Sequence, residues 1–148
     1  MDRSVTVLEQ ENSLACDCDA AWQVLADFGN FLAWATGGAG TVRLEGEGVG
    51  MTRHLDIPGL GLVSERLDRL DHASQTLAYS MVSETMAGMA RYSATVQVTT
   101  DGAGQCCLRW RGDFEPLPGI DSEEVGNSLA GSYTLMSQGL EAFVNAQA

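Results

Sequence analysis

The stretch DIPGLGLVSERLDRLD, from Asp56 to Asp71, begins with a glycine-rich turn and continues as an alternating strand. Because successive side chains of a strand face opposite sides, its more apolar side carries Val63, Glu65, Leu67 and Arg69. The other side carries Leu62, Ser64, Arg66, Asp68 and Leu70. Glu65 therefore lies between two apolar residues on the side that we expect to face the interior.

A carboxylate on an interior face needs a partner, because an unpaired buried charge is costly. It can stay protonated, form an ion pair or meet water. We predict that Glu65 faces a wet cavity that is polar at one point. The alternatives are an acid at an exposed sheet edge, or an ion pair with Arg53 or Arg43 on a neighbouring strand. A cavity position would also allow Glu65 to act as a general acid or base.

Further short segments with strand character surround this stretch, separated by turn residues. The turns are GVG at 48–50, PGLG at 58–61, DHAS at 71–74 and DGAG at 101–104. Such short connections favour an antiparallel meander. We expect strands at residues 4–8, 41–47, 51–57, 62–70, 76–83, 92–99 and 106–114.

Helical spacing appears before and after the strands. Asp17 or Asp19 can cap a helix, which we expect to end at Gly29. A second short helix is expected at 31–34. A long helix capped by Asp121 is expected to end the chain, frayed over its last four residues. Its apolar stripe comprises Val125, Leu129, Ser132, Tyr133, Met136, Leu140 and Phe143.

This order of elements predicts an α+β fold. A length of 148 residues suits one domain spanning 1–148. A sheet of seven antiparallel strands cannot stay flat, because strands twist. We therefore expect a curved sheet wrapped around the long C-terminal helix, with two short helices after the first strand. Such an arrangement tends to leave a cavity between the sheet and the helix.

Composition excludes several classes of function. The formal net charge is −12, and nucleic-acid binding depends on Lys and Arg contacts to phosphate, so we expect no nucleic-acid partner. No apolar run approaches the roughly 20 residues of a membrane span, and no signal-peptide pattern is visible, so we expect a cytoplasmic protein. Cys16, Cys18, Cys106 and Cys107 lack zinc-site spacing; we predict reduced thiols, no metal and no cofactor.

Three segments and the order of elements resemble the Bet v 1-like, START-related (SRPBCC) superfamily. It includes bacterial polyketide cyclase/dehydrase-like proteins and plant abscisic-acid receptors. The segments are SERLDRLD at 64–71, RYSATVQV at 91–98 and LRWRGDFEPLPG at 108–119. The resemblance covers nearly the whole chain. It implies a helix-grip fold that holds a hydrophobic ligand between the sheet and the last helix.

The resemblance also implies site residues. Glu65 would join a water network around the ligand, Tyr92 would face the cavity, and residues 58–61 would act as a gate. Trp34 or a neighbour stands near the place of a lysine that binds the ligand carboxylate in the receptors. Methionines stand where the receptors have a His-Arg-Leu latch. These departures argue against abscisic acid as the ligand.

Alternation along the strands and spacing along the last helix extend the predicted cavity wall. On the strand at 106–114 we expect the apolar phase inside, because three inward charges would need full pairing; the opposite phase would bring Arg111 into the pocket. Gly112 would then leave room for a ligand, and Met86 is expected near the mouth. The predicted ligand-binding residues are Trp34, Arg53, Leu55, Ile57, Leu60, Glu65, Tyr79, Met81, Met89, Tyr92, Ala94, Trp110, Leu129, Tyr133 and Met136.

Three functions fit this pattern. The first is binding of a hydrophobic small molecule, such as a lipid, polyketide or aromatic metabolite. The second is a polyketide cyclase/dehydratase-type enzyme in which Glu65 and Tyr92 are catalytic residues that move protons. The third is a regulatory module whose gate presents Leu60 and Leu62 to a partner. No pair of groups with clear catalytic spacing is visible, so the sequence favours binding. It does not indicate an oligomeric state.

Overall fold

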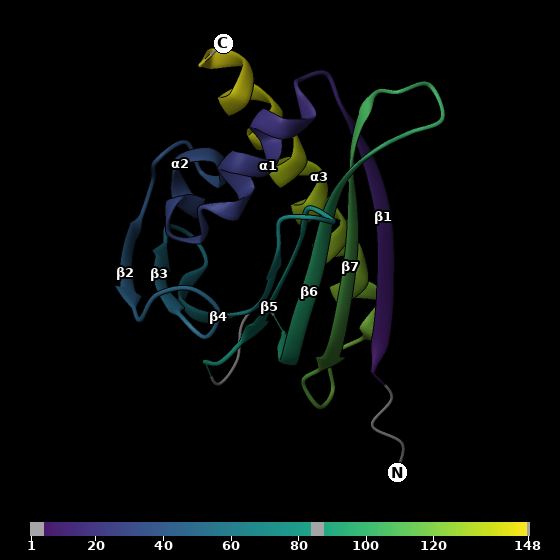
Figure 1. Ribbon diagram of the computed structural model, residues 1–148. Helices are drawn as coiled ribbons and strands as arrows, with labels where there is room; N and C mark the ends of the chain where they lie inside the picture. The colour runs from purple at the N-terminus through teal and green to yellow at the C-terminus, as the bar shows by residue number, and fades with distance from the viewer. Residues whose placement is uncertain (1–4, 84–87, 148) are drawn as a thin grey trace.

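The computed structural model describes residues 5–83 and 88–147. Within these residues one antiparallel sheet has the strand order β1-β7-β6-β5-β4-β3-β2 (Figure 1). Its strands are β1 (Thr6–Leu14), β2 (Thr41–Glu45), β3 (Thr52–Ile57), β4 (Gly61–Asp71), β5 (Thr76–Met81), β6 (Met89–Thr100) and β7 (Cys106–Pro116). The helical segments are α1 (Cys18–Ala26), the 3-10 turn η1 (Phe28–Asn30), α2 (Phe31–Ala35) and α3 (Ser122–Ala146). The predicted α+β fold is confirmed.

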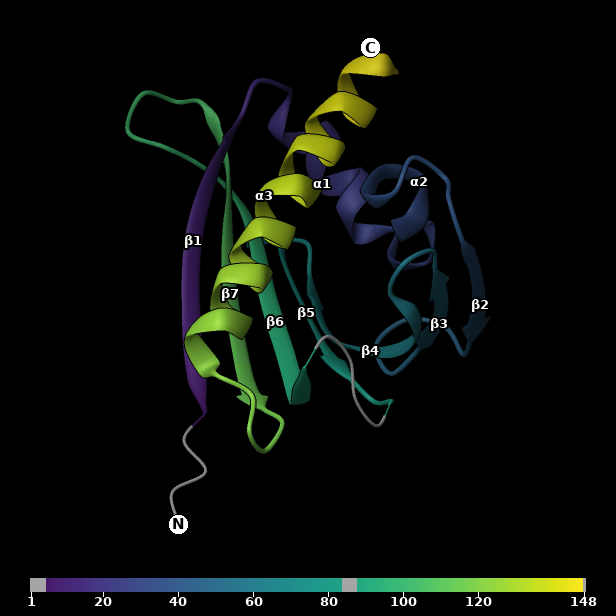
Figure 2. The same cartoon turned by 180° about the vertical axis from the view of Figure 1, so that it is seen from behind.

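The sheet is curved, and α3 lies on its concave side. Figures 1 and 2 show α3 crossing β1, β7 and β6, while β2, β3 and β4 curl round at the other side of the sheet. The short helices α1 and α2 lie at one end of this arrangement, and both contact α3. The Nε1–H of Trp22 in α1 donates to Nδ1 of His72, 3.1 Å away in the turn after β4. The helices thus close one end of the space between the sheet and α3.

The first strand is longer than the predicted strand at 4–8, because β1 continues to Leu14. Ser4 lies outside the described residues. The second half of β1 is polar and shows no apolar alternation. It is nevertheless paired with β7 along its whole length, and Oε1 of Glu11 lies 3.0 Å from Nε of Arg109. Cross-strand charge pairs therefore replace the apolar pattern there.

The strand β4 contains a β-bulge that the alternation did not predict. The register of β4 against β5 shifts between Leu67 and Arg69. The extra residue, Asp68, changes the side to which the following residues point. Arg69, predicted on the interior side with Glu65, is therefore exposed, and that prediction is wrong. The other strands differ from their predicted bounds only by a few residues at their ends.

Both predicted caps are confirmed. The side chain of Asp17 accepts a hydrogen bond from the first turn of α1 at 2.9 Å, and that of Asp121 accepts one from the first turn of α3 at 3.4 Å. The predicted end of the first helix is wrong, because α1 ends at Ala26 and a 3-10 turn follows. Gly29 allows a close approach instead, since a Cβ atom there would lie 2.6 Å from the Leu44 side chain.

The predicted apolar stripe of α3 packs on the concave side of the sheet, although Ser132 is exposed at its edge. Asn145, predicted to be frayed, is helical, and its Nδ2 donates to the Ala15 carbonyl at 3.0 Å. This contact ties the end of α3 to the segment after β1. The fully or nearly fully buried residues of α3 are Val125, Leu129, Tyr133, Ser137, Leu140 and Val144.

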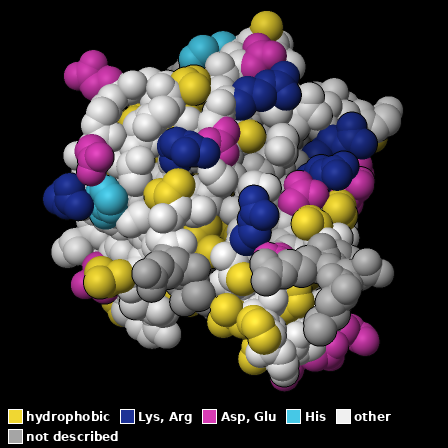
Figure 3. All heavy atoms as spheres, turned by 90° about the horizontal axis from the view of Figure 1, so that it is seen from below, with side chains coloured by type: hydrophobic (Ala, Val, Ile, Leu, Met, Phe, Trp, Pro, Cys, Tyr) yellow, Lys and Arg dark blue, Asp and Glu magenta, His cyan; other side chains and the backbone are white. Residues whose placement is uncertain are grey.

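The surface carries charges of both signs. In Figure 3 basic and acidic side chains lie next to one another at several places on the end face that it shows. Some large apolar side chains are also exposed, among them Leu60, Leu62 and Leu135. In the part of the chain that the structure describes, no helix is both long enough and apolar enough to cross a membrane.

Candidate functional site

A cavity of about 260 Å³ lies between the concave side of the sheet, α2 and α3. The sheet and the β3–β4 turn contribute Leu55, Ile57, Leu60, Val63, Glu65, Tyr79, Met89 and Tyr92. The helices contribute Phe31, Ala35, Thr36, Val125, Ser128, Leu129, Ser132, Leu135 and Met136. Because Leu60 and Leu135 are also exposed to solvent, the cavity opens between the β3–β4 turn and α3.

Glu65 is the one charged residue among the described residues of this wall. It is 5% exposed and lies opposite Arg53 in the pairing of β3 with β4. The guanidinium of Arg53 donates to Oε1 of Glu65 twice, from Nε at 2.9 Å and from Nη2 at 2.8 Å. None of the described groups donates to the second oxygen, Oε2. One carboxylate oxygen is thus held by Arg53, and the other has no donor among residues 5–83 and 88–147.

The buried position of Arg53 is supported by more than the ion pair. Its side chain is 3% exposed, and its Nη1 donates to the carbonyl of Phe28 at 3.0 Å. The guanidinium carbon lies 3.9, 4.2 and 5.1 Å from the ring centroids of Phe28, Phe31 and Tyr79. Aromatic faces attract a cation and partly replace its lost water. Arg53 is therefore a rigid support for Glu65.

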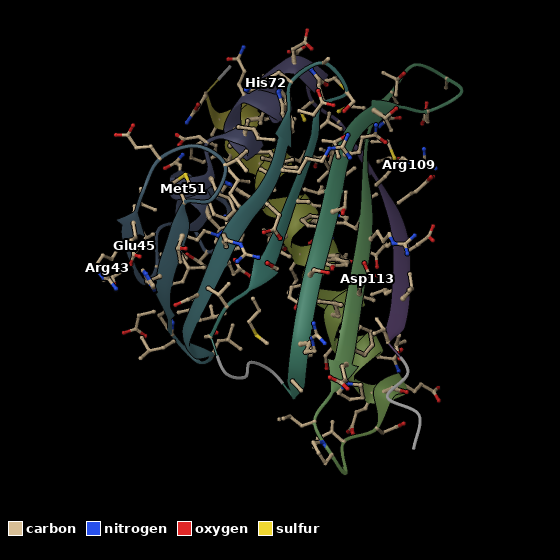
Figure 4. The ribbon with its side chains drawn as sticks, turned by 60° about the horizontal axis from the view of Figure 1, so that its bottom comes forward. Arg43, Glu45, Met51, His72, Arg109 and Asp113 are labelled. Atoms are coloured by element: carbon tan, nitrogen blue, oxygen red, sulfur yellow. The ribbon has the colours of Figure 1, made fainter. Side chains whose placement is uncertain are left out.

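The alternatives predicted for Glu65 can now be compared. Its burial excludes an exposed edge acid. The ion pair with Arg53 is present, whereas Nη1 of Arg43 lies 3.9 Å from Oε1 of Glu45. Figure 4 shows Arg43 and Glu45 on the edge strand β2, pointing away from the sheet. The ion pair and the cavity position, which the sequence presented as alternatives, occur together.

All three tyrosines of the chain meet beside the cavity. The hydroxyl oxygen of Tyr92 lies 2.7 Å from that of Tyr133 and 3.4 Å from that of Tyr79. Burial raises the pKa of each hydroxyl well above its ordinary value, and the nearby charge of Glu65 raises the pKa of Tyr79 further. All three hydroxyls are therefore neutral at physiological pH.

The core next to the cavity is built on Tyr133. Its ring is fully buried and stacks on Trp110 with centroids 4.5 Å apart. The indole Nε1 of Trp110 donates to Oγ of Ser137 at 2.9 Å. A Cβ atom at Gly112 would overlap the hydroxyl of Tyr133. The room that Gly112 leaves is therefore filled by Tyr133, and the expectation that a ligand fills it is wrong.

The orientation of β7 follows the predicted phase. Trp110 and Phe114 are buried, whereas Arg109 and Asp113 lie on the outer face of the sheet (Figure 4). Arg111 is also exposed and lies 3.4 Å from a carboxylate oxygen of Asp113. The alternative in which Arg111 enters the pocket is excluded.

The cavity brings together part of the predicted ligand-binding set. Of the predicted residues that the structure describes, nine line the cavity: Leu55, Ile57, Leu60, Glu65, Tyr79, Met89, Tyr92, Leu129 and Met136. Six are not part of its wall: Trp34, Arg53, Met81, Ala94, Trp110 and Tyr133. Met86, expected near the mouth, lies outside the described residues.

Four of these six residues lie behind the wall. Arg53 holds Glu65 from the side away from the cavity. The rings of Trp110 and Tyr133 stack on each other, and neither lines the cavity. Ala94 is buried and has only a methyl group, so longer neighbouring side chains form the wall.

The other two lie beside it. Trp34 is buried and packs edge-on against Phe31, with ring centroids 5.1 Å apart. Phe31 is thus the aromatic residue of this region that reaches the cavity. Met81 packs against the small apolar cluster that includes Leu55 and Val63. It supports the wall without lining it.

Eight lining residues were missing from the predicted set: Phe31, Ala35, Thr36, Val63, Val125, Ser128, Ser132 and Leu135. Some carried a signal, since Val63 shares a strand face with Glu65, and Val125 and Ser132 belong to the stripe of α3. The contribution of α2 required knowledge of how it packs. Leu135 lies off the stripe and is 68% exposed, so its sequence position gave no indication of a cavity.

Comparison with protein families supplies an independent result. Residues 6–146 match the model described as polyketide cyclase / dehydrase and lipid transport. The chain belongs to this family. The resemblance to the SRPBCC superfamily is therefore confirmed. No curated protein matches the chain significantly.

Members of the same fold are found among solved structures. A norcoclaurine synthase from Thalictrum flavum, in complex with dopamine and hydroxybenzaldehyde, has a TM-score of 0.77 at 19% identity, over 98% of this chain and 89% of that one. XoxI from Bacillus cereus has a TM-score of 0.75 at 22% identity, over 95% of both chains. An uncharacterized protein from Bacillus thuringiensis has a TM-score of 0.73 at 22% identity, over 95% of this chain and 98% of that one. Such identities concern the fold alone, and they confirm the helix-grip fold.

Proposed function

We propose that this member of the polyketide cyclase/dehydrase and lipid transport family binds a hydrophobic small molecule in the cavity between the sheet and α3. The observation that carries the proposal is an apolar cavity with one carboxylate in its wall. An apolar cavity of about 150 Å³ holds benzene. A volume of about 260 Å³ therefore suits a substituted ring or two fused rings, and the open mouth allows a longer group to protrude.

The polar end of the ligand is set by Glu65. Arg53 occupies Oε1, so Oε2 is the oxygen available to a ligand. An ionised carboxylate only accepts hydrogen bonds. The preferred ligand therefore carries a donor, such as a phenolic or alcoholic hydroxyl, at its inner end. The norcoclaurine synthase of the same fold was solved with hydroxylated single-ring compounds, which agrees with this chemical class.

Catalysis of the cyclase/dehydratase type is the second candidate, because Glu65 and Tyr92 line one cavity. A proton-transfer group works best when its pKa lies near the working pH. Burial holds the pKa of Tyr92 far above neutrality, so its hydroxyl stays neutral and is a poor donor of a proton and a poor base. The carboxylate of Glu65 is tied to Arg53. We therefore favour binding over turnover.

The proposal is tested by calorimetric titration with 2-naphthol, which has two fused rings and one hydroxyl donor. A variant Val63→Phe would fill part of the cavity, because Val63 is buried in its wall. The matched control is Leu62→Phe on the next residue, which is 77% exposed. We expect saturable binding to the wild type and to Leu62→Phe, and at least tenfold weaker binding to Val63→Phe.

Thermal denaturation of each variant shows whether it is folded at the titration temperature. Equal binding to a folded Val63→Phe variant would place the ligand elsewhere and contradict the proposal. For the enzyme candidate, mass spectrometry would follow the incubation of the protein with a reactive polyketide chain. Release of a cyclised or dehydrated product, lost in Tyr92→Phe, would favour the enzyme.

A further inference from the structure

Three of the four cysteines come together at one end of the molecule, away from the ligand cavity. Cys16 lies in the turn between β1 and α1, Cys18 is the first residue of α1, and Cys106 is the first residue of β7. Figure 1 shows the β1–α1 turn and the start of β7 at the same end of the sheet. None of the three lines the cavity. The fold therefore gathers thiols from segments that are distant in the sequence, and the proposed ligand site does not use them.

The contacts among these thiols centre on Cys106. Cys106 pairs with Leu14 of β1, two residues before Cys16, and Cys16 and Cys18 both pack against the buried cluster that contains Cys106. The Cys18 thiol is also held by the carbonyl of Thr99 at 3.3 Å. Cys106 is buried, whereas Cys16 and Cys18 are partly accessible. Cys107, the next residue, points to the other face of β7 and hydrogen-bonds to the backbone of its own strand at 3.7 Å.

Thiols gathered in one cluster suggest either a metal site or a disulfide. Among the described residues, no group of three or more Cys, His, Asp or Glu side chains is arranged to hold a metal ion. All four cysteines are present as free thiols. We propose that Cys106 and one of its two neighbours, Cys16 or Cys18, form a reversible disulfide when a two-electron oxidant such as hydrogen peroxide is present.

The chemistry needs one accessible thiol and one resolving thiol. The thiolate of Cys16 or Cys18 attacks one peroxide oxygen, the O–O bond breaks, and the products are a sulfenic acid and, after protonation, water. The thiolate of Cys106 then attacks the sulfenic sulfur and expels hydroxide, which takes up a proton to give a second water. Overall, two S–H bonds and one O–O bond are lost, and one S–S bond and two O–H bonds form, so the two electrons of the thiols reduce the peroxide. A dithiol reductant reverses the step by exchange.

The surroundings predict a slow reaction at neutral pH. Burial, and then the charges of Glu141, Cys18 and Asp17, raise the pKa of Cys16. Burial, followed by the contacts with Cys18 and Cys16, raises the pKa of Cys106. Thiolates, which are the reactive form, are therefore scarce near pH 7. We expect the rate of disulfide formation to rise as the pH rises toward 9.

The disulfide would tie the β1–α1 turn to the start of β7. A cross-link between segments so distant in the sequence removes more freedom from the unfolded chain than a short one does. We therefore expect the oxidised protein to melt several degrees above the reduced protein, and we expect a reductant to restore the lower melting temperature.

The test is peptide mapping after treatment with hydrogen peroxide at pH 8. Trypsin cleaves after arginine, so Cys16 and Cys18 share the peptide 4–43, and Cys106 and Cys107 share the peptide 92–109. We expect a mass loss of two hydrogens and a cross-link between these two peptides that a reductant removes. The variant Cys107→Ala is the matched control and should form the same cross-link. The variant Cys106→Ala should form none.

Each result decides the matter. The cross-link in wild type and in Cys107→Ala supports the proposal even if Cys106→Ala fails to fold. A cross-link lost in Cys107→Ala would assign it to the wrong thiol. A disulfide within the peptide 4–43, a disulfide-linked dimer, or four free thiols after treatment at pH 9 would each overturn the proposal.

Discussion

The buried ion pair between Arg53 and Glu65 gives the most quantitative prediction. Side-chain exposures of 4% and 7% place both charges out of water. Removing one partner of such a pair typically costs about 3–5 kcal/mol, because the other charge is left buried and unpaired. Arg53 keeps the Phe28 carbonyl and three aromatic faces, and Glu65 keeps its cavity. We therefore expect the lower end of the range, about 3 kcal/mol, for both Glu65→Leu and Arg53→Met.

The double variant should behave differently. Replacing a whole buried pair with apolar residues of similar size is often neutral or stabilising, so we expect its free energy of unfolding to lie within about 1 kcal/mol of wild type. For a chain of this length each kcal/mol shifts the melting temperature by roughly 2–4 °C. Urea denaturation of the four proteins measures the coupling. Two single losses below about 1 kcal/mol that simply add in the double variant would refute the reasoning, because they would mean that water screens the pair.

Two further predictions follow from the same region. The three buried tyrosines have pKa values raised by burial, so the unfolded chain loses these protons first as the pH rises. Their contribution to stability is therefore complete below about pH 10 and declines above it by up to about 4 kcal/mol per pH unit. Absorbance at 295 nm should show tyrosinate appearing only with cooperative unfolding, and gradual ionisation of a folded protein would contradict the burial. At Gly112 a methyl group would collide with the Tyr133 hydroxyl, so Gly112→Ala should lose about 1–3 kcal/mol by overpacking. At Gly131 the added carbon would have no atom within 4 Å apart from the adjacent residues and the helix's own backbone, so Gly131→Ala should gain about 0.5–1 kcal/mol in the helix. Equal effects of the two changes in a melting experiment would speak against the Tyr133 packing.

The fold was predictable because its signals are local. The alternation of apolar and polar side chains, interrupted by short turns, predicted the strands of the meander. The cap at Asp121 and the apolar stripe after it predicted α3. The polar half of β1 was not predictable in this way, since its partners Arg109 and Arg111 are about 100 residues away and only their pairing explains Glu9 and Glu11. The bulge at Asp68 is likewise a property of two strands together.

The candidate site was predictable only in part. Alternation identifies the face on which Glu65 and Tyr92 lie, but not how deeply each side chain reaches. Whether Tyr133 lines a cavity or fills the space above Gly112 depends on a three-dimensional fit that alternation does not contain. The orientation of Arg53 depends on rings from η1, α2 and β5 that no spacing rule connects. Sequence patterns thus predicted the faces, and packing decided which residues of each face line the cavity.

The most direct test of the proposed function is a crystal structure of the protein soaked with 2-naphthol. We predict that the naphthalene rings lie in the cavity between the sheet and α3, with the hydroxyl oxygen at hydrogen-bonding distance, about 2.5–2.7 Å, from Oε2 of Glu65. A cavity that stays empty at saturating concentration, or a ligand bound outside it with Glu65 untouched, would contradict the proposed function.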